Sequence, residues 1–488
     1  MSERLRPRDV ALLAEESPST PMHNATLEIF EPGVPGGAPL DHAALVRLVQ
    51  ERISFVPRYR QRVQEVPGWL ANPVWVDDEH FDLGYHVRRS ALPRPGTVDQ
   101  LRELTARIVS RPLDRSRPLW EIYVIEGLAG GQVALLSKAH EVLVDGIDTV
   151  DLGQVLLDGS PESRLLGPDV WRPQGRPSPL ELVASAVRDS VTSTATVTET
   201  VRSTTGAVLR RAAAGVRSAE RVIDALTSRT PGVDPVLDAP FLGPLSQQRR
   251  VVTVETDLAD HRRVRDAHGG TVNDVVLATV AGALRAWLMA RGELLRGGHR
   301  IRAVVPLSVI DEDLEATSLG SQIAAHFVDL PVGEPSPVVR LHQVSYAFAA
   351  HQETGRAVGA SRLAGLSGFA PATFHAVGSR LAARERRPYR LCVTNVPGPQ
   401  TPLYAAGARM VATYPIPPLL ERHPIAIGVT SYDGAVFYGV TADRDLVPDA
   451  DVLEACLLEA LDELVDSAAG GRTRAPRGRA RRTEERPS

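Results

Sequence analysis

The sequence is poor in several residue types, and each shortage excludes a class of protein. Its 488 residues include 2 Cys, which excludes a disulfide framework and a cysteine-rich metal site. No run approaches the ~18 consecutive apolar residues of a membrane span, and no apolar signal-like core follows the N-terminus. A formal net charge of −4 creates no field that attracts nucleic acid. We therefore expect a cytoplasmic protein that binds no nucleic acid.

Lysine is the scarcest basic residue. Of the 55 Lys and Arg residues, one is a lysine, Lys138, and the others are arginine. A GC-rich genome explains the bias, and the exception makes Lys138 a position of interest. The residues after Gly471 are rich in arginine and lack large apolar side chains, which predicts a disordered basic tail over 469–488. The favoured interpretation is a solvated extension. The alternative is contact with anionic lipid, at the inner face of the plasma membrane or on lipid droplets.

Two regions of alternating strands and helices are separated by an apolar helical stretch. We predict a first lobe over 1–176, a helical connector over 177–240 and a second lobe over 241–468, in an α/β fold. In the first lobe, the predicted strands are Ala25–Phe30, Trp120–Ile125 and Val133–Lys138, and the helices are Asp41–Ile53 and Thr97–Ser110. In the second, the strands are Val251–Glu255, Arg302–Leu307, Leu391–Thr394, Ile425–Thr430 and Ala435–Val440, and the helices are Val275–Met289, Val338–Ala350, Ala372–Leu381 and Val452–Val465.

The residues that can carry chemistry follow the strand Val133–Lys138. The chain continues Ala-His-Glu-Val-Leu-Val-Asp-Gly from position 139, which predicts a loop before a helix at Ile147–Leu157. A zinc site of the H-E-x-x-H kind is excluded because position 144 is Val. No nucleophile elbow and no phosphate-binding glycine loop occur in the sequence.

A general-base site fits these residues. His140 or Glu141 can take a proton from a hydroxyl that attacks an acyl group, with Asp145 as the orienting carboxylate and Gly146 allowing the turn. The alternative is a turn histidine beside an Asp-Gly turn signal. The local residues alone favour that alternative, because short motifs often match by chance.

The segment resembles the bacterial wax ester synthase/diacylglycerol acyltransferase family, within the CoA-dependent acyltransferase superfamily that also contains condensation domains. The superfamily motif His-His-x-x-x-Asp-Gly stands here as His140 and Glu141, followed after three intervening residues by Asp145 and Gly146. Further blocks occur in the expected order, from about Leu5 to Val465. They are Pro21-Met22-His23, Pro118-Leu119-Trp120, Asn273-Asp274, Val305-Pro306-Leu307-Ser308 and Asn395-Val396-Pro397-Gly398.

The resemblance implies a two-lobed fold like that of chloramphenicol acetyltransferase, with the active site in a tunnel between the lobes. It also implies transfer of a fatty acyl group from acyl-CoA, as co-substrate and without a metal or other cofactor, to diacylglycerol or a long-chain alcohol. Substrate contacts are then expected from the blocks at Pro118, Leu119 and Trp120, at Asn273 and Asp274, and at Asn395, Pro397 and Gly398. Asn273 or a neighbour would cap its helix, and 395–398 would form a loop near the tunnel.

The sequence departs from the family at the presumed base, where Glu141 replaces the second histidine. Three hypotheses follow. Glu141 is the base, with its pKa raised in an apolar tunnel; or His140 takes over that role; or the chain binds acyl-CoA or neutral lipid without efficient turnover. Lys138 shares a strand face with His140. We expect it to contact a CoA phosphate, Glu141 or Asp145, unless its presence is a compositional accident.

Overall fold

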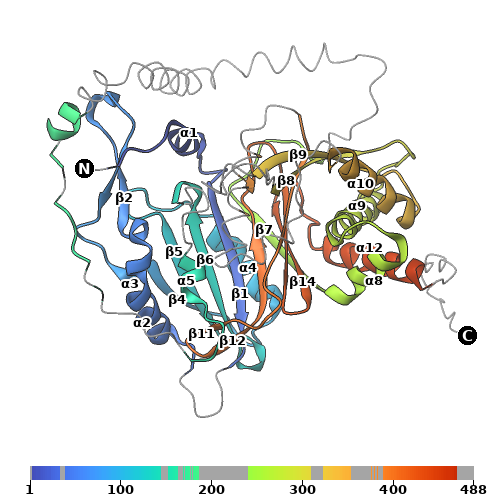
Figure 1. The fold of residues 1–488 in the computed structure, drawn as a ribbon, viewed down its shortest axis with the longest axis horizontal. Coiled ribbons are helices and arrows are strands. Elements are labelled where there is room, and N and C mark those ends of the chain that lie inside the picture. The colour runs from blue at the N-terminus through green and yellow to red at the C-terminus, as the bar shows by residue number, and fades with distance from the viewer. Residues whose placement is uncertain are drawn as a thin grey trace, which may run out of the picture.

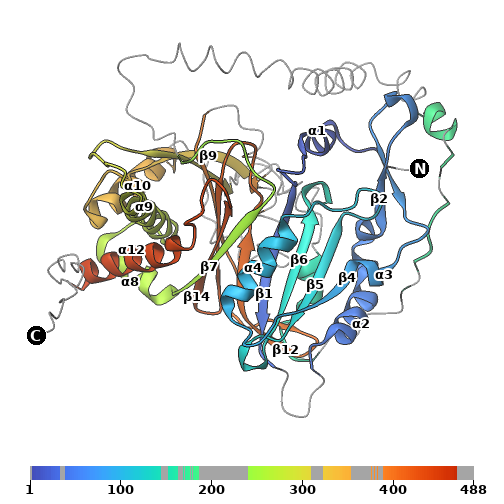
Figure 2. The ribbon, with the colours of Figure 1, turned by 180° about the vertical axis from the view of Figure 1, so that it is seen from behind.

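The structure is a computed structural model, and it describes residues 3–32, 39–143, 152–162, 169, 171–175, 177–178, 180–185, 240–308, 323–352, 375, 378–379, 382 and 388–469. Its strands form two six-stranded sheets and one two-stranded sheet. Figure 1 shows the two large sheets side by side, with helices on the outer side of each, and Figure 2 shows the same arrangement from behind. The predicted two-lobed α/β architecture is confirmed.

The first lobe is built on the strands that flank the motif strand. Its sheet has the order β11-β12-β1-β6-β5-β4. β6 (Val133–His140) lies between β1 (His23–Phe30) and β5 (Trp120–Glu126) and runs antiparallel to both. β4 (Val87–Ala91) pairs in parallel with β5 at the edge. The three predicted strands are confirmed, and β6 continues two residues beyond its predicted end, to His140.

Side-chain caps set where two helices of this lobe begin, as the sequence predicts. The Asp41 carboxylate accepts a backbone N–H of the first turn of α2 (His42–Arg52). Thr97 and Gln100 form a capping box on α4 (Val98–Val109). The remaining elements of the lobe are α1 (Pro7–Glu15), α3 (Leu83–His86), α5 (Leu152–Leu156), the paired strands β2 (Gln61–Gln64) and β3 (Val74–Asp77), and 3-10 turns at 53–55, 57–60, 67–69, 129–131 and 141–143.

The second sheet has the order β7-β14-β13-β10-β8-β9. Its centre is parallel: β10 (Leu391–Pro397) pairs in parallel with β8 (Ile301–Ser308) and with β13 (Ile425–Tyr432). β7 (Arg249–Asp257), β14 (Ala435–Asp443) and β9 (Ile323–Leu330) form antiparallel pairs at its two sides. The helices α8 (Leu258–His268), α9 (Val272–Ala290), α10 (Pro337–Gln352) and α12 (Val452–Ala468) lie together on the outer side of this sheet (Figure 1).

A strand from the second half of the chain completes the first sheet. β12 (Ala408–Ile416) pairs antiparallel with β1, and β11 (Tyr404–Ala405) extends that edge. The predicted second lobe, 241–468, is one continuous stretch of sequence. Two of its strands, β11 and β12, nevertheless belong to the first sheet. β12 also crosses β14 closely. The approach is so tight that a Cβ atom on Gly439 of β14 would overlap the carbonyl oxygen of Pro415 in β12. Glycine at this position allows the two sheets to meet.

α9 is the helix in the described part of the chain that is long and apolar enough to cross a membrane by length and composition. Its apolar window is 72% buried within the fold. Trp287 and Leu284 are fully buried, and the helix packs against α8, α10 and α12. We therefore assign α9 as the central helix of the second lobe.

The elements absent from the sequence prediction are the helices α1, α3 and α8 and the strands β2, β3, β4, β9, β11 and β12. α8 is rich in charged residues and has a weak apolar stripe, and β12 contains Pro415. The predicted helix at Ala372–Leu381 is described at positions 375, 378 and 379, which are helical. Most of the predicted connector, 177–240, and all but the first residue of the predicted tail, 469–488, lie outside the described residues.

Candidate active site

Three separate sequence blocks meet where β6 ends. His140 pairs with His23 of β1, and its N–H donates to the carbonyl oxygen of Leu119 at 2.9 Å. The N–H of Glu141 donates to the carbonyl oxygen of Met22 at 3.0 Å. The backbone thus holds the first two motif residues from both neighbouring strands, at the end of β6.

His140 is fully buried within the first lobe. Its Nδ1 accepts the N–H of Val142 at 3.1 Å, so the ring proton of the neutral imidazole is on Nε2. Nε2 lies 3.7 Å from Glu16 Oε1, just after α1. Burial alone would raise the pKa of Glu16, but the hydrogen-bonding groups of His140 and Arg115 and the Arg115 charge lower it to about 2. Both ring nitrogens of His140 therefore face groups of its own lobe, which favours a structural role.

Glu141 is fully buried at the seam between the two lobes. Its Oε1 accepts the side-chain amide of Asn24 at 3.1 Å. From the second lobe, β10 brings Cys392 near enough for the two groups to interact electrostatically. Burial, and then the Glu141 charge, raise the pKa of the Cys392 thiol to about 12. Glu141 is thus the motif residue that faces both lobes.

The second lobe adds a histidine that the sequence analysis missed. His375 is buried, and its Nδ1 lies 2.6 Å from Thr394 Oγ1 on β10. Burial lowers its pKa to about 3, so the ring is neutral near pH 7. One helical turn later, Ser379 Oγ lies 3.5 Å from Asn24 Oδ1. No motif surrounds His375, so its role could not be predicted from the sequence around it. The nearest indication was its partner Thr394, which directly precedes the Asn-Val-Pro-Gly block.

Lys138 lies at the C-terminal end of α4, away from Glu141. Its Nζ donates to the carbonyl oxygens of Arg111 at 2.8 Å and Ile108 at 3.4 Å, and lies 3.4 Å from Glu121 Oε2. His23 Nε2 lies 3.0 Å from the carbonyl oxygen of Val109. Both side chains satisfy carbonyl groups that a helix end leaves open. Burial lowers the pKa of Lys138 and Glu121 opposes that effect. These contacts support a structural role for the lone lysine, and its contact with substrate stays a prediction.

Pro118, Leu119 and Trp120 lie inside the first lobe, where they support β5. All three are buried, and Trp120 Nε1 donates to the carbonyl oxygen of Tyr59 at 2.7 Å. The indole stacks on His86 with 4.5 Å between ring centroids. Burial lowers the pKa of His86 to about 4, which keeps that ring neutral at pH 7. The block fixes the carbonyl group that binds the His140 backbone, and direct substrate contact by it stays a prediction.

The predicted residues of the second lobe join α9 to β10. Asn395 Nδ2 donates to Asn273 Oδ1 at 3.0 Å. The cap of α9 is Thr271, a neighbour of Asn273, and Asp274 completes its capping box. Ser345 of α10 also donates to Asp274, at 3.1 Å. These contacts set the position of β10 relative to α9.

The expected loop at 395–398 is corrected by the structure. Asn395 and Pro397 belong to β10, because residues 392–397 pair in parallel with β13. Gly398 follows the strand and its N–H donates to the carbonyl oxygen of Ser431 at 2.9 Å. Pro397 is accommodated at the last position of the strand, where its missing N–H costs little.

The second part of the motif cannot be placed. Asp145 and Gly146 lie in 144–151, outside the described residues. Among the described residues, no group of three or more His, Cys, Asp or Glu side chains could hold a metal ion.

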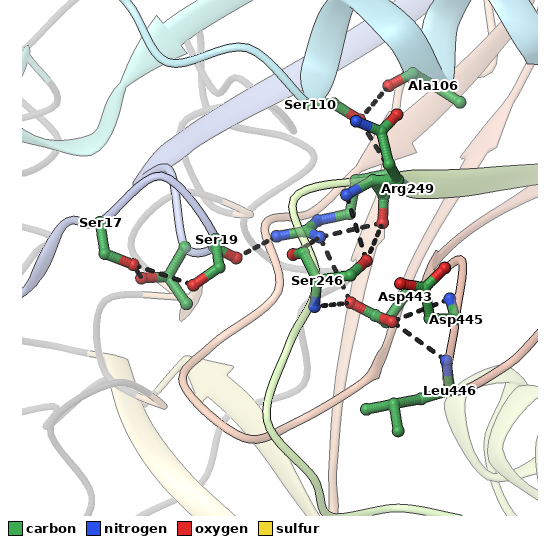
Figure 3. Close-up of polar contacts among 11 residues, drawn as sticks. Ser17, Ser19, Ala106, Ser110, Ser246, Arg249, Asp443, Asp445 and Leu446 are labelled. Carbon is green, nitrogen blue, oxygen red and sulfur yellow. Dashed lines mark hydrogen bonds and ion pairs between the residues drawn. The ribbon is translucent and has the colours of Figure 1, made fainter.

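Arg249 connects the two lobes beside this site (Figure 3). The guanidinium donates to the carbonyl oxygens of Ser246 at 2.9 Å and Gln248 at 3.1 Å, and to that of Ser19 in the first lobe. The N–H of Arg249 donates to Ser110 Oγ, just after α4, at 3.0 Å. One residue of β7 therefore binds two separate segments of the first lobe.

Asp443 provides the charge opposite Arg249. Its Oδ2 lies 3.5 Å from Arg249 Nη1 and accepts the N–H of Ser246 at 2.7 Å. Its Oδ1 accepts the N–H groups of Asp445 and Leu446. Burial lowers the pKa of Arg249, and Asp443 opposes that effect. The pair is a buried polar junction at the seam that also contains Glu141.

Comparison with known protein families agrees with this architecture. Residues 5–276 match the wax ester synthase/diacylglycerol acyltransferase catalytic domain, and residues 319–465 match the WS/DGAT C-terminal domain. A putative diacylglycerol O-acyltransferase of Mycobacterium tuberculosis is 32% identical over 472 residues, which cover 95% of this chain and 90% of that protein.

Solved structures give the same result. The wax ester synthase/diacylglycerol acyltransferase from Marinobacter aquaeolei VT8 matches with a TM-score of 0.65 and 25% identity, over 96% of this chain and all of that one. The starter condensation domain of rhizomide synthetase matches with a TM-score of 0.51 and 14% identity, over 96% of this chain and 94% of that one. The second likeness concerns the fold alone.

Proposed function

Because the chain belongs to the wax ester synthase/diacylglycerol acyltransferase family, we propose that it transfers a fatty acyl group from acyl-CoA to the hydroxyl of diacylglycerol or a long-chain alcohol. The observation that carries the proposal is the placement of Glu141. Its carboxylate is buried at the seam of the two lobes, directly after the motif histidine, and an amide hydrogen bond holds it. A carboxylate in such a site can act as a general base.

The proposed step is a direct acyl transfer. The acceptor oxygen attacks the thioester carbonyl carbon, the new C–O bond forms, and the C–S bond of acyl-CoA breaks. Glu141 takes the hydroxyl proton and returns it to the departing CoA thiolate, so that an ester and free CoA result. His140 supports the motif, because Val142 and Glu16 face its two ring nitrogens. General acid–base assistance of this kind contributes ~10²–10⁴-fold to a rate.

The test measures CoA release from palmitoyl-CoA in the presence of dioleoylglycerol or hexadecanol, with ester formation measured separately. We expect activity in the wild type and a loss of about 10²-fold or more in Glu141→Ala. Glu459→Ala is the matched control, because Glu459 is exposed on α12. Circular dichroism confirms that each variant is folded.

Two outcomes would contradict the proposal in different ways. A fully active Glu141→Ala would exclude Glu141 as the base while leaving the reaction itself intact. A silent wild type beside an active Glu141→His would support the alternative, a protein that binds acyl-CoA or neutral lipid without turnover.

A further inference from the structure

Asn24 holds the Glu141 side chain from the middle of the first sheet. Its Nδ2 donates to Glu141 Oε1 at 3.1 Å, across 117 positions of sequence. Asn24 lies on β1 opposite Ala139, next to the backbone pair of His23 and His140. Its backbone is therefore fixed by the same strand pairing that fixes the motif, and its side chain begins from a rigid position.

The second lobe contacts the other end of the same amide. Ser379 Oγ lies 3.5 Å from Asn24 Oδ1 and 3.1 Å from the carbonyl oxygen of His375, so its hydroxyl proton is within reach of both. This helical turn is pressed onto the second sheet. A Cβ atom on Gly378 would lie 2.8 Å from Pro306 Cγ and 3.0 Å from Thr394 Cγ2. Close packing thus sets how near Ser379 comes to Asn24.

The chemistry of an amide determines which end faces which group. A carboxylate accepts hydrogen bonds, so it requires the NH2 of Asn24, whereas a hydroxyl can donate to the amide oxygen. The observed arrangement satisfies both requirements at once. The orientation of the Asn24 amide is therefore determined by Glu141 on one side and Ser379 on the other.

We propose that Asn24 is a positioning residue for the acyl transfer: its amide holds the Glu141 carboxylate where it takes the acceptor's proton, and Ser379 orients that amide across the lobe junction. This inference rests on the proposed function. An amide donor stabilises the ionised carboxylate, so Asn24 also keeps Glu141 able to accept a proton as the pH falls. A residue that merely filled space would change neither orientation nor protonation.

The titratable groups around Glu141 restrict what a pH profile can report. Glu16 has a pKa of about 2, His375 of about 3 and Cys392 of about 12, and burial lowers the pKa of His23 well below its usual range. Among the described residues, His140 and Lys138 on β6 are further ionisable groups; His140 Nδ1 accepts the N–H of Val142, and Lys138 Nζ donates to the carbonyl oxygen of Arg111. Asn24 contacts Glu141 directly, so an acid limb that moves in the Asn24 variants reports on Glu141.

The experiment compares the wild type, Asn24→Ala and Asn24→Asp in the acyltransferase assay between pH 5 and 9. For Asn24→Ala we expect kcat to fall about 10- to 100-fold, KM for palmitoyl-CoA to stay within about twofold, and the acid limb of the kcat profile to move to higher pH. Asn24→Asp places a second carboxyl group beside Glu141 and should move that limb further.

Asn72→Ala is the matched control. Asn72 is also an asparagine of the first lobe, with its amide on the carbonyl oxygen of Leu5 at 3.1 Å. Its loss should lower stability without moving the acid limb. An Asn24→Ala enzyme with an unmoved limb and wild-type kcat would overturn the inference while the proposed function stood.

An inactive wild type would refute the proposed function. In that case a second measurement still tests the inference about Asn24. Urea unfolding of Asn24→Ala, Glu141→Ala and the double variant forms a thermodynamic cycle. A contact that holds Glu141 predicts that the losses of stability are not additive. Additive losses would show that Asn24 does not hold Glu141, whatever the enzyme does.

Discussion

Arg249 joins the two lobes through buried polar contacts, and replacing that arginine with methionine tests this junction directly. Methionine retains the apolar part of the side chain and removes the guanidinium. The variant therefore leaves the carbonyl oxygens of Ser19, Ser246 and Gln248 without this donor, and Asp443 without its facing charge.

The magnitude follows from the burial of the pair. The side chains of Arg249 and Asp443 are 3% and 0% exposed, and breaking such a pair on one side costs about 3–5 kcal/mol. Two features place the value at the lower end. Gln248 is exposed, so water can reach its carbonyl group, and Asp443 keeps three backbone N–H donors. We expect Arg249→Met to lose about 3 kcal/mol of unfolding free energy.

The assay is urea unfolding followed by fluorescence, with acyltransferase activity measured in the absence of urea. Arg250→Met is the control, because Arg250 is partly exposed and pairs with the exposed Asp451 at 2.8 Å, an interaction of about 0–1 kcal/mol. Arg249→Met should also lower activity, since it loosens the seam that holds Glu141. Equal stability of Arg249→Met and Arg250→Met would refute the assignment of Arg249 as the lobe junction.

Three further predictions follow from the same contacts. Lys138→Met should lose about 3 kcal/mol of stability, the lower end for a broken buried pair, because it uncaps α4 while Glu121 keeps Arg88 at 3.0 Å and the Tyr123 hydroxyl at 2.8 Å; an altered KM for acyl-CoA in a stably folded Lys138→Arg would contradict the structural role. The pKa of Glu16 is lowered to about 2, so the stability that its charge contributes is complete above pH ~4.5 and is lost as the pH falls toward 2. Glu16→Gln should therefore reduce the free energy of unfolding by about 2–3 kcal/mol at pH 6, a value discounted because Arg115 is half-exposed. The difference from the wild type should shrink at pH 3, as measured by urea titration. The alternative interpretation of the basic tail, contact with anionic lipid, predicts salt-sensitive binding to anionic liposomes; binding that survives deletion of 472–488 would exclude the tail.

The motif and its partners show how far sequence reasoning could reach. The strand that leads into the motif was predictable, since a run of β-forming residues precedes a turn signal, but it ends at His140 and not at the predicted Lys138. The contact of Asn24 with Glu141 was not, because it spans 117 positions and depends on the register of two strands. Ser379 and His375 lie still further along the chain, in a segment without a motif.

Lys138 shows the limit of a rule based on strand alternation. Strand alternation correctly places Lys138 and His140 on one face, and from this the sequence suggested a shared site. The face is occupied by the end of α4, so the lysine binds helix carbonyl groups before it could reach a substrate. Alternation specifies the direction of a side chain but not which element packs there.

The sequence by itself determined the local features: the strands of both sheets that carry β-branched runs, the caps at Asp41 and Thr97, and the apolar helix α9. Each depends on interactions within a few residues, which propensity and periodicity describe. The tertiary structure decided that β12 completes the first sheet, that Arg249 joins the lobes and that Asn24 and Ser379 surround Glu141. These contacts depend on packing between distant segments, and the free energy that selects them is that of the whole fold.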